Sequence, residues 1–283
     1  SSANVDLYIK TNLGGDFFDD IFFDAYIPSC LFLGEVKKIY KNNFVVTILE
    51  SDQVGLRKTG PFRFNFTYNK QTSNRDIISV IEYVLEYVRN LSTVYCVHSS
   101  TVLIKGNLFV FWGCATGVGK TRTAKVLAKK LGGTFVSDEK GLFCLKEKRF
   151  LGGVSKMYTH RTVNEKYSLN NEFIDLGTST SKLQNIRTMC FVYIHNLGSK
   201  AKESAAFPFS EKEFGWHLYE DLTRKIRGTS RRVNNSSIPL MSLDTESLSK
   251  KRVEDVRKFC KKIKCYYVRS DEGAIISFIK SNL

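Results

Sequence analysis

The sequence predicts an α/β fold with a β-rich N-terminal portion, and three observations carry this prediction. Strand-like runs alternate with turn clusters over the first 70 residues, at 5–9, 31–36, 44–49 and 62–66. A helical pattern then opens at Asn74. A strand, a glycine-rich turn, a helix and a second strand follow one another between residues 108 and 137. We expect residues 1–72 to form the β-rich portion, packed on a core formed by 73–283.

Composition favours a packed globular protein in a reducing compartment. The chain has 283 residues, of which 42% are hydrophobic and 13% aromatic, enough to bury a sizeable core. Its seven cysteines show neither C-x-x-C spacing nor the histidine partners of a zinc site, so we interpret them as reduced thiols. No apolar run approaches the roughly 18 residues that a membrane span needs. We therefore expect a cytoplasmic protein that has no membrane partner.

The sequence pattern of residues 74–112 predicts a helix followed by three strands. Six aliphatic residues recur at helical spacing after Asn74, namely Ile77, Ile78, Ile81, Val84, Leu85 and Val88. Their shared face is expected to pack on a sheet. Strands are expected at 94–97, 101–104 and 108–112, and Lys105, Gly106 and Asn107 indicate a hairpin turn between the last two.

The nine residues 113–121, Gly-Cys-Ala-Thr-Gly-Val-Gly-Lys-Thr, have the composition of a phosphate-binding P-loop. Glycines let the backbone curve around oxyanions, the Lys120 ammonium can neutralise β- and γ-phosphates, and the Thr121 hydroxyl can bind Mg²⁺. We expect ATP or GTP with Mg²⁺ to bind here, held by Thr116, Gly117, Val118, Gly119, Lys120, Thr121 and Arg122. The first glycine of the G-x-x-x-x-G-K-[ST] pattern falls at Cys114, and Gly113 stands one position earlier. An ordinary glycine-rich turn is the alternative interpretation.

A second strand that ends in two carboxylates completes this unit. The helix is expected at 120–131, ended by Gly132, and a short strand at 134–137 leads into Asp138 and Glu139. A right-handed crossover would lay this strand parallel to the strand before the loop, so both carboxylates would emerge beside the phosphate site. Asp138 or Glu139 can then hold Mg²⁺, directly or through water, or accept a proton from an attacking hydroxyl. A structural turn or helix cap is the alternative for Asp138.

Four segments occur in a set order between residues 94 and 140. They are Val-His-Ser-Ser at 97–100, Lys-Gly-Asn-Leu-Phe-Val-Phe-Trp at 105–112, Thr-Gly-Val-Gly-Lys-Thr-Arg-Thr-Ala at 116–124 and Phe-Val-Ser-Asp-Glu at 135–139. Together they resemble the catalytic domain of HPr kinase/phosphorylase, whose nucleotide-binding core is shared with phosphoenolpyruvate carboxykinases. The closing segment 264–279 looks like the strand and helix that end related kinase-like domains. The resemblance implies a P-loop nucleotide-binding core of the HPr kinase type.

The resemblance also implies roles for particular side chains. Asp138 would be the base that activates the acceptor hydroxyl, and His98 would lie beside the acidic pair and tune its proton affinity. Glu139 would help to hold the metal with Asp138 and Thr121, while Lys120 and Thr121 would bind the nucleotide phosphates. A buried histidine that is merely hydrogen-bonded is the alternative for His98. The N-terminal portion shows no match to that of the bacterial enzyme, so kinase chemistry carries over better than HPr as the acceptor.

Positive charge is concentrated near the C-terminus. The net charge is +15, and residues 221–270 hold 14 Lys or Arg against 5 Asp or Glu. Such a segment attracts phosphate-rich or acidic partners, although a solvated basic surface is the alternative. A helical pattern runs from Phe214 to Leu222 and leads into a basic loop. A helix is expected at 250–264, with Val253, Val256 and Phe259 inward and with Lys251, Arg252, Lys258, Lys261 and Lys262 largely outward.

Three functional hypotheses follow. The first is a kinase that transfers the γ-phosphate of ATP or GTP to a hydroxyl of a protein serine, a nucleic acid or another anionic acceptor. The second is a nucleotide-dependent switch or slow NTPase that binds nucleic acid or an acidic partner through its basic surface. The third is a carboxykinase-type enzyme, for which no separate carboxylate-binding set is visible. Candidates for an extra cation over the γ-phosphate are Arg122, Lys156, His160 and Arg161.

Overall fold

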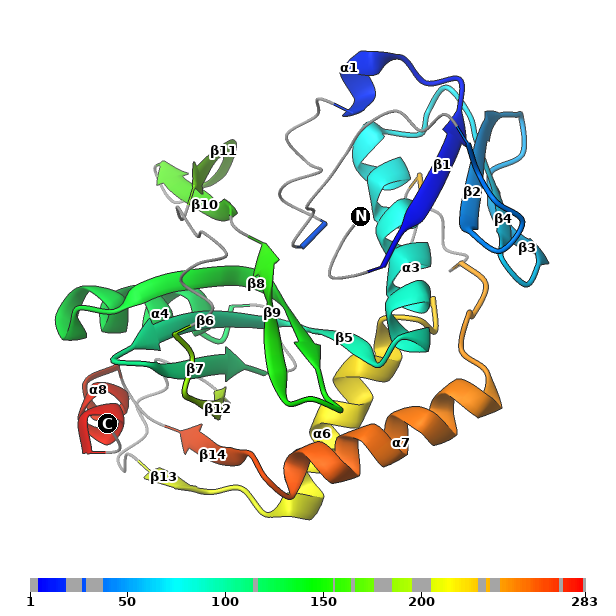
Figure 1. Cartoon of the computed structure of the whole chain (residues 1–283). Coiled ribbons are helices and arrows are strands. Elements are labelled where there is room, and N and C mark those ends of the chain that lie inside the picture. Colours follow the sequence, from blue (N-terminus) through cyan, green and yellow to red (C-terminus); the bar gives the residue numbers. More distant parts are fainter. Residues whose placement is uncertain are drawn as a thin grey trace.

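The structure is a computed structural model of the chain, and its fold is mixed α/β, as the sequence predicts (Figure 1). It describes residues 5–18, 27–28, 38–113, 117–154, 156–163, 166–175, 185–194, 205–228, 233–234, 240–269 and 272–281. For β10 (Lys156–Val163) and β11 (Lys166–Asp175), which pair as an antiparallel ribbon, it describes the backbone alone. The strand expected at 31–36 lies outside the described residues.

The larger sheet has eight strands in the order β13-β14-β12-β7-β6-β8-β5, with β9 paired to β8. Their bounds are β13 Ala205–Pro208, β14 Lys264–Arg269, β12 Thr188–Ile194, β7 Asn107–Trp112, β6 Ser99–Ile104, β8 Thr134–Cys144, β5 Val94–Val97 and β9 Arg149–Val154. Strands β7, β12 and β14 are parallel, whereas β6 is antiparallel to both β7 and β8. Strand β8 therefore runs in the same direction as β7.

Helices cover both faces of this sheet because its central strands are apolar on both sides. The helices are α4 Lys120–Leu131, α6 Glu211–Arg224, α7 Glu246–Cys260 and α8 Glu272–Ser281. Along β7, Leu108, Val110 and Trp112 belong to the core that includes α6 and α7. Phe109 and Phe111 point the other way, into the core shared with α4 and α8. The helix predicted at 120–131, the helical pattern around 214–222 and the closing strand and helix are confirmed.

A smaller sheet, in the order β1-β2-β4-β3, forms the N-terminal portion. Its strands are β1 Leu7–Thr11, β2 Phe44–Glu50, β3 Gly55–Gly60 and β4 Arg63–Tyr68, accompanied by α1 Gly15–Phe18 and α3 Asn74–Leu91. The Ser73 side chain caps α3 by accepting the backbone N–H of Asp76. The aliphatic face of α3, including Ile78 and Val84, packs with Phe64 of β4, and α3 also contacts β5 and α7. This helix therefore joins the small sheet to the rest of the molecule (Figure 1).

Two strand expectations are corrected and one turn is confirmed. The short strand expected at 134–137 is wrong in length, because β8 continues to Cys144 through a register shift between Asp138 and Gly141. Strand β8 has the expected direction, but β6 lies between it and β7. The hairpin turn is confirmed, since Lys105 (φ 49) and Gly106 (φ 83) both adopt the left-handed conformation of a type I′ turn.

The helix expected at 250–264 is observed as α7 at 246–260, because β14 already begins at Lys264, and its predicted orientation is wrong at two positions. Val256 and Phe259 are buried, as expected, but Val253 is 45% exposed and the Arg252 side chain is fully buried. Arg252 Nη2 donates to both carboxylate oxygens of Asp244 at 2.7 Å, and its Nε donates to Thr223 at 3.0 Å. An arginine can occupy the apolar side of a helix when its charge is matched in this way.

Two expectations from composition concern membrane-spanning segments and the state of the cysteines. In the described part of the chain, no helix is long and apolar enough to cross a membrane. Five cysteines are described, and all five are free thiols: Cys96, Cys144, Cys190, Cys260 and Cys265. The other two, Cys30 and Cys114, lie outside the described residues.

Candidate functional site

The glycine-rich loop (residues 113–121) connects the end of β7 to the start of α4. Gly117 (φ 84) and Gly119 (φ 100) adopt left-handed conformations that suit glycine, and α4 begins at Lys120 without a side-chain hydrogen bond to its first amides. A Cβ atom at Gly113 would lie 2.7 Å from the carbonyl oxygen of Ile194 on β12. Close packing of β7 against β12 thus explains why a glycine stands at position 113, one residue before the first glycine of the phosphate-binding pattern.

Lys120 lies at the start of α4 in a largely enclosed position, 6% exposed. Burial lowers the pKa of its ammonium group, and the negative charges of Glu139, Asp221 and Asp138 oppose that shift. The helix N-terminus favours an anion here, whereas these three carboxylates offset part of the positive charge of Lys120.

Asp138 lies at the centre of a buried hydrogen-bonded set that also contains Ser100 and Thr121. Its Oδ1 atom accepts the Ser100 hydroxyl at 2.5 Å and the Thr121 hydroxyl at 2.8 Å, and the two hydroxyl oxygens are 3.3 Å apart. Asp138 is 1% exposed. Burial raises the pKa of this carboxyl group, the two hydroxyl hydrogen bonds lower it, and the charge of Glu139 raises it further. The net effect is a raised pKa.

Glu139 faces His98 and has the opposite shift. His98 Nε2 lies 3.0 Å from Glu139 Oε2, and this hydrogen bond is the main cause of the lowered pKa of Glu139. The Glu139 side chain is 49% exposed, whereas that of His98 is 14% exposed. Glu139 adopts a left-handed φ of 60°, which is uncommon for a residue other than glycine. Such strained positions often occur at functional sites.

The register shift in β8 turns the two adjacent carboxylates toward different partners. Strand β8 pairs with β6 through Ser137, and on its other side Asp138 is opposite Val154 and Gly141 is opposite Gly153 of β9. A Cβ atom at Gly153 would clash with the backbone of β8 and lie 2.5 Å from the Ser137 Cβ. Glycine at this position on β9 therefore allows the bulge to form.

Two functional candidates were not identified from the sequence, Ser100 and Asp221. The strand carrying Ser100 was expected to begin only at residue 101, yet β6 begins at Ser99 and directs the Ser100 hydroxyl to Asp138. Asp221 on α6 accepts the backbone N–H of His98 at 3.0 Å and pairs with Arg224 at 2.9 Å. No local pattern signals a contact between residues 123 positions apart.

The structure describes only some of the remaining predicted site residues. Val118 packs partly buried against the α4 core, and Arg122 is exposed on the first turn of α4. Thr116 lies outside the described residues, as do the side chains of Lys156, His160 and Arg161 on β10. The site defined by geometry thus consists of the end of the glycine-rich loop and the set around Asp138 and Glu139.

A buried ionic cluster lies near this site on α3. Arg89 donates to Glu82 at 3.1 Å and to Glu86 at 2.6 Å, and Lys140, next to Glu139 in the chain, pairs with Glu82 at 3.2 Å. Ligand atoms of Glu82, Glu86 and Cys96 lie within 4.8 Å of one another, as in a metal site. Because Arg89 binds both carboxylates, we assign these residues as a buried ion-pair cluster.

The assembled site combines a helix start that has no side-chain cap with a lysine, two hydroxyl groups and two carboxylates, beside the inner strands β6 and β8 of the larger sheet. No family model matches the chain, and no curated protein matches it. Chemically, the arrangement can bind an oxyanion at the loop, supply oxygen ligands to a hard cation and accept a proton at a buried carboxylate.

Proposed function

We propose that the protein is a kinase that transfers the γ-phosphate of ATP or GTP to a hydroxyl group of an anionic or macromolecular acceptor. The observation that carries the proposal is the hydrogen-bonded set of Thr121, Asp138 and Ser100. A buried carboxylate lies within one hydrogen bond of the residue that ends the phosphate-binding motif. The resemblance to the HPr kinase catalytic domain, drawn from the sequence, supports the same chemistry.

The groups at the glycine-rich loop fit a nucleotide with Mg²⁺. Mg²⁺ prefers carboxylate and hydroxyl oxygens, which Glu139 and Thr121 supply. The first amides of α4 have no side-chain cap, and the helix dipole favours phosphate oxygens there. When bound, the metal ion neutralises charge that develops on the phosphates. The ammonium group of Lys120 adds positive charge at the same end of the helix.

The opposite pKa shifts of the two carboxylates suggest a division of roles. Burial raises the pKa of Asp138, so its carboxylate is the better proton acceptor and is assigned as the base for the acceptor hydroxyl. The hydrogen bond from His98 lowers the pKa of Glu139, which keeps that group ionised and suited to a cation. His98 is assigned as a positioning residue, because it acts through Glu139.

The acceptor class is inferred from charge. A net charge of +15 favours an anionic acceptor, either a protein serine in an acidic context or a nucleic acid. Within the basic segment, however, Arg224 and Arg252 are paired with Asp221 and Asp244. The lysine and arginine side chains that contact an acceptor must then come from other positions of this segment.

Transfer of label from γ-labelled ATP tests the proposal. The protein is incubated with Mg²⁺, labelled ATP and separate fractions of protein, DNA, RNA and metabolites. We expect label in one acceptor fraction, and its loss in Lys120→Ala. Lys125→Ala, which removes an exposed lysine five residues further along α4, is the matched control and should transfer normally. Release of inorganic phosphate with no labelled acceptor would instead identify a slow NTPase and contradict the kinase assignment.

A further inference from the structure

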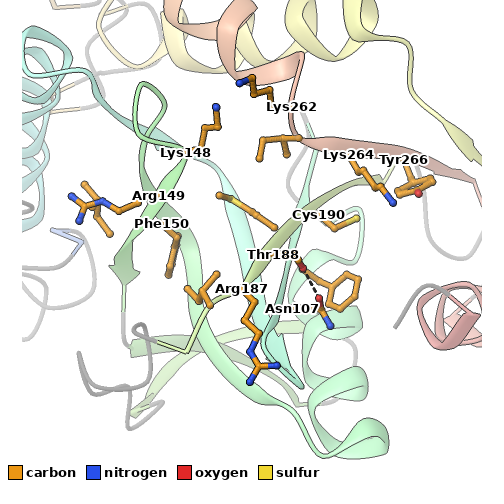
Figure 2. A pocket seen from close by; sticks show the side chains of 15 residues that line it. Asn107, Lys148, Arg149, Phe150, Arg187, Thr188, Cys190, Lys262, Lys264 and Tyr266 are labelled. Atoms are coloured by element: carbon orange, nitrogen blue, oxygen red, sulfur yellow. Dashed lines mark hydrogen bonds between the residues drawn. The ribbon is translucent and has the colours of Figure 1, made fainter.

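A cavity of about 880 Å³ opens at the end of the larger sheet opposite the glycine-rich loop (Figure 2). Asn107, Thr188 and Lys264, the first residues of β7, β12 and β14, all line it. The glycine-rich loop instead follows Trp112, the last residue of β7, so the length of a strand separates the two places. Ligands of open α/β sheets usually bind at the carboxyl ends of the strands. The cavity is therefore distinct from the site at the loop.

Positive charge dominates the lining of this cavity. Of its fifteen lining residues, five are Lys or Arg and none is Asp or Glu. Figure 2 shows the ammonium groups of Lys148, from the turn between β8 and β9, and Lys262, after α7, pointing toward one another. Partial desolvation and the facing Lys262 lower the pKa of Lys148. Lys264 is near enough to Cys190 to oppose the burial that raises the pKa of that thiol.

Two ammonium groups that face one another repel, and an anion between them removes the repulsion. Figure 2 shows Arg149 and Arg187, the two arginines of the lining, pointing away from Lys148 and Lys262. Arg149 points away from the centre of the cavity in Figure 2 and pairs with Glu147 at 2.7 Å. Lys148 and Lys262 are thus the pair best placed to hold an anion.

Apolar side chains supply the rest of the lining. Phe109, Phe150, Met189, Ile263 and Tyr266 come from four different strands and the segment before β14. Such surfaces favour the burial of a ring or a short aliphatic group. The cavity volume lies within the range of about 300–1,000 Å³ that is typical of small-molecule sites.

We propose that this cavity binds a small organic phosphate whose remaining part is apolar or aromatic, with the phosphate group held between Lys148 and Lys262. A concave site of this volume favours a small molecule over a nucleic acid, which would need an extended basic track. Paired lysines match the double charge of a phosphate monoester. This binding is independent of nucleotide binding at the glycine-rich loop.

Titration calorimetry with phenyl phosphate tests the proposal, with inorganic phosphate and benzoate as comparison ligands. We expect saturable binding of phenyl phosphate that is about tenfold or more tighter than that of inorganic phosphate, because only the former buries a ring. Benzoate, which carries a single charge, should also bind more weakly. Equal binding of phenyl phosphate and inorganic phosphate would contradict the apolar part of the site.

A pair of double variants locates the binding. Lys148→Gln with Lys262→Gln should weaken phenyl phosphate binding by at least about tenfold, because it removes two charge-assisted hydrogen bonds. Lys146→Gln with Lys261→Gln is the matched control: it removes the same charge from nearby exposed lysines that do not line the cavity. Equal losses of affinity for phenyl phosphate in the two double variants would show that general surface charge causes the weakening, and would overturn the proposal.

Lysine modification followed by mass spectrometry gives a local readout in the unaltered protein. Saturating phenyl phosphate should slow reductive methylation of Lys148 and Lys262 and leave Lys146 and Lys261 unchanged. Absence of protection at the first two residues would exclude binding at this cavity. If a single-stranded oligonucleotide bound more tightly than phenyl phosphate and protected the same two lysines, the ligand would be a nucleic acid and the small-molecule assignment would be wrong.

Discussion

Replacement of Ser100 by alanine tests whether the hydroxyl group stabilises an ionised Asp138. The Ser100 hydroxyl lies 2.5 Å from Asp138 Oδ1, and both residues are buried. A hydrogen bond to a charged group contributes about 1.5–3 kcal/mol, so Ser100→Ala should lower the free energy of unfolding by that amount near pH 8. For a chain of this size the melting temperature should fall by roughly 3–6 °C.

Ser137→Ala is the matched control for this variant. Ser137 is equally buried, and its hydroxyl lies 2.8 Å from Thr101 Oγ1, a pair of neutral groups that does not include a carboxylate. Loss of a neutral hydrogen bond costs about 0.5–1.5 kcal/mol. The control should therefore be less destabilising than Ser100→Ala.

The dependence on pH separates the two variants further. Burial raises the pKa of Asp138 above its value in the unfolded chain, so its ionised form destabilises the fold above that raised pKa. The Ser100 hydrogen bond lowers the pKa and thus stabilises mainly the ionised form. As pH falls and Asp138 becomes protonated, the effect of Ser100→Ala should shrink, whereas that of Ser137→Ala should stay constant. Urea denaturation near pH 8 and at the lowest pH at which both variants still fold measures this. Equal effects of the two variants at both pH values would refute the assignment.

Three further substitutions test the packing around the site by urea denaturation. Gly153→Ala should destabilise the fold by about 1–3 kcal/mol, because its Cβ would clash with the β8 bulge, whereas Gly55→Ala, with open space around it, should change stability by less than about 0.5 kcal/mol. Asp244→Asn should cost about 3–5 kcal/mol, because it leaves the buried charge of Arg252 without its counter-ion; a cost under about 1 kcal/mol would contradict that. Tyr83→Phe should cost about 1–3 kcal/mol, since the single hydroxyl proton is shared between the carbonyl oxygens of Ile226 and Met241 and the hydroxyl oxygen accepts the backbone N–H of Leu243; an unchanged stability would contradict that.

Local signals in the sequence were sufficient to predict the helix after the glycine-rich loop and the hairpin turn before it. Gly132 is the C-cap of α4 in a left-handed conformation, and Lys105 with Gly106 forms the expected tight turn. Strand β3 was missed, since its sequence Gly-Leu-Arg-Lys-Thr-Gly is largely polar and it lies at the edge of the small sheet. A polar edge strand lacks the alternation on which a sequence prediction depends.

Long-range partners account for the parts of the fold and site that could not be predicted. Arg252 is buried because Asp244, Thr223 and Asn90 surround its guanidinium group, and nothing in the local helical pattern indicates these contacts. Ser100 joins Asp138 only because β6 lies between β7 and β8. A crossover rule predicts the direction of β8 but not which strand lies beside it.

The most direct test of the kinase proposal is Asp138→Asn, in parallel measurements of nucleotide affinity and phosphate transfer. The substitution preserves shape and a hydrogen-bond acceptor for Ser100 and Thr121, but it removes the proton-accepting carboxylate. We expect the affinity for nucleotide to change by less than about threefold, while transfer falls by about 10²–10⁴-fold. Transfer within about tenfold of the wild-type rate would contradict the assignment of Asp138 as the base.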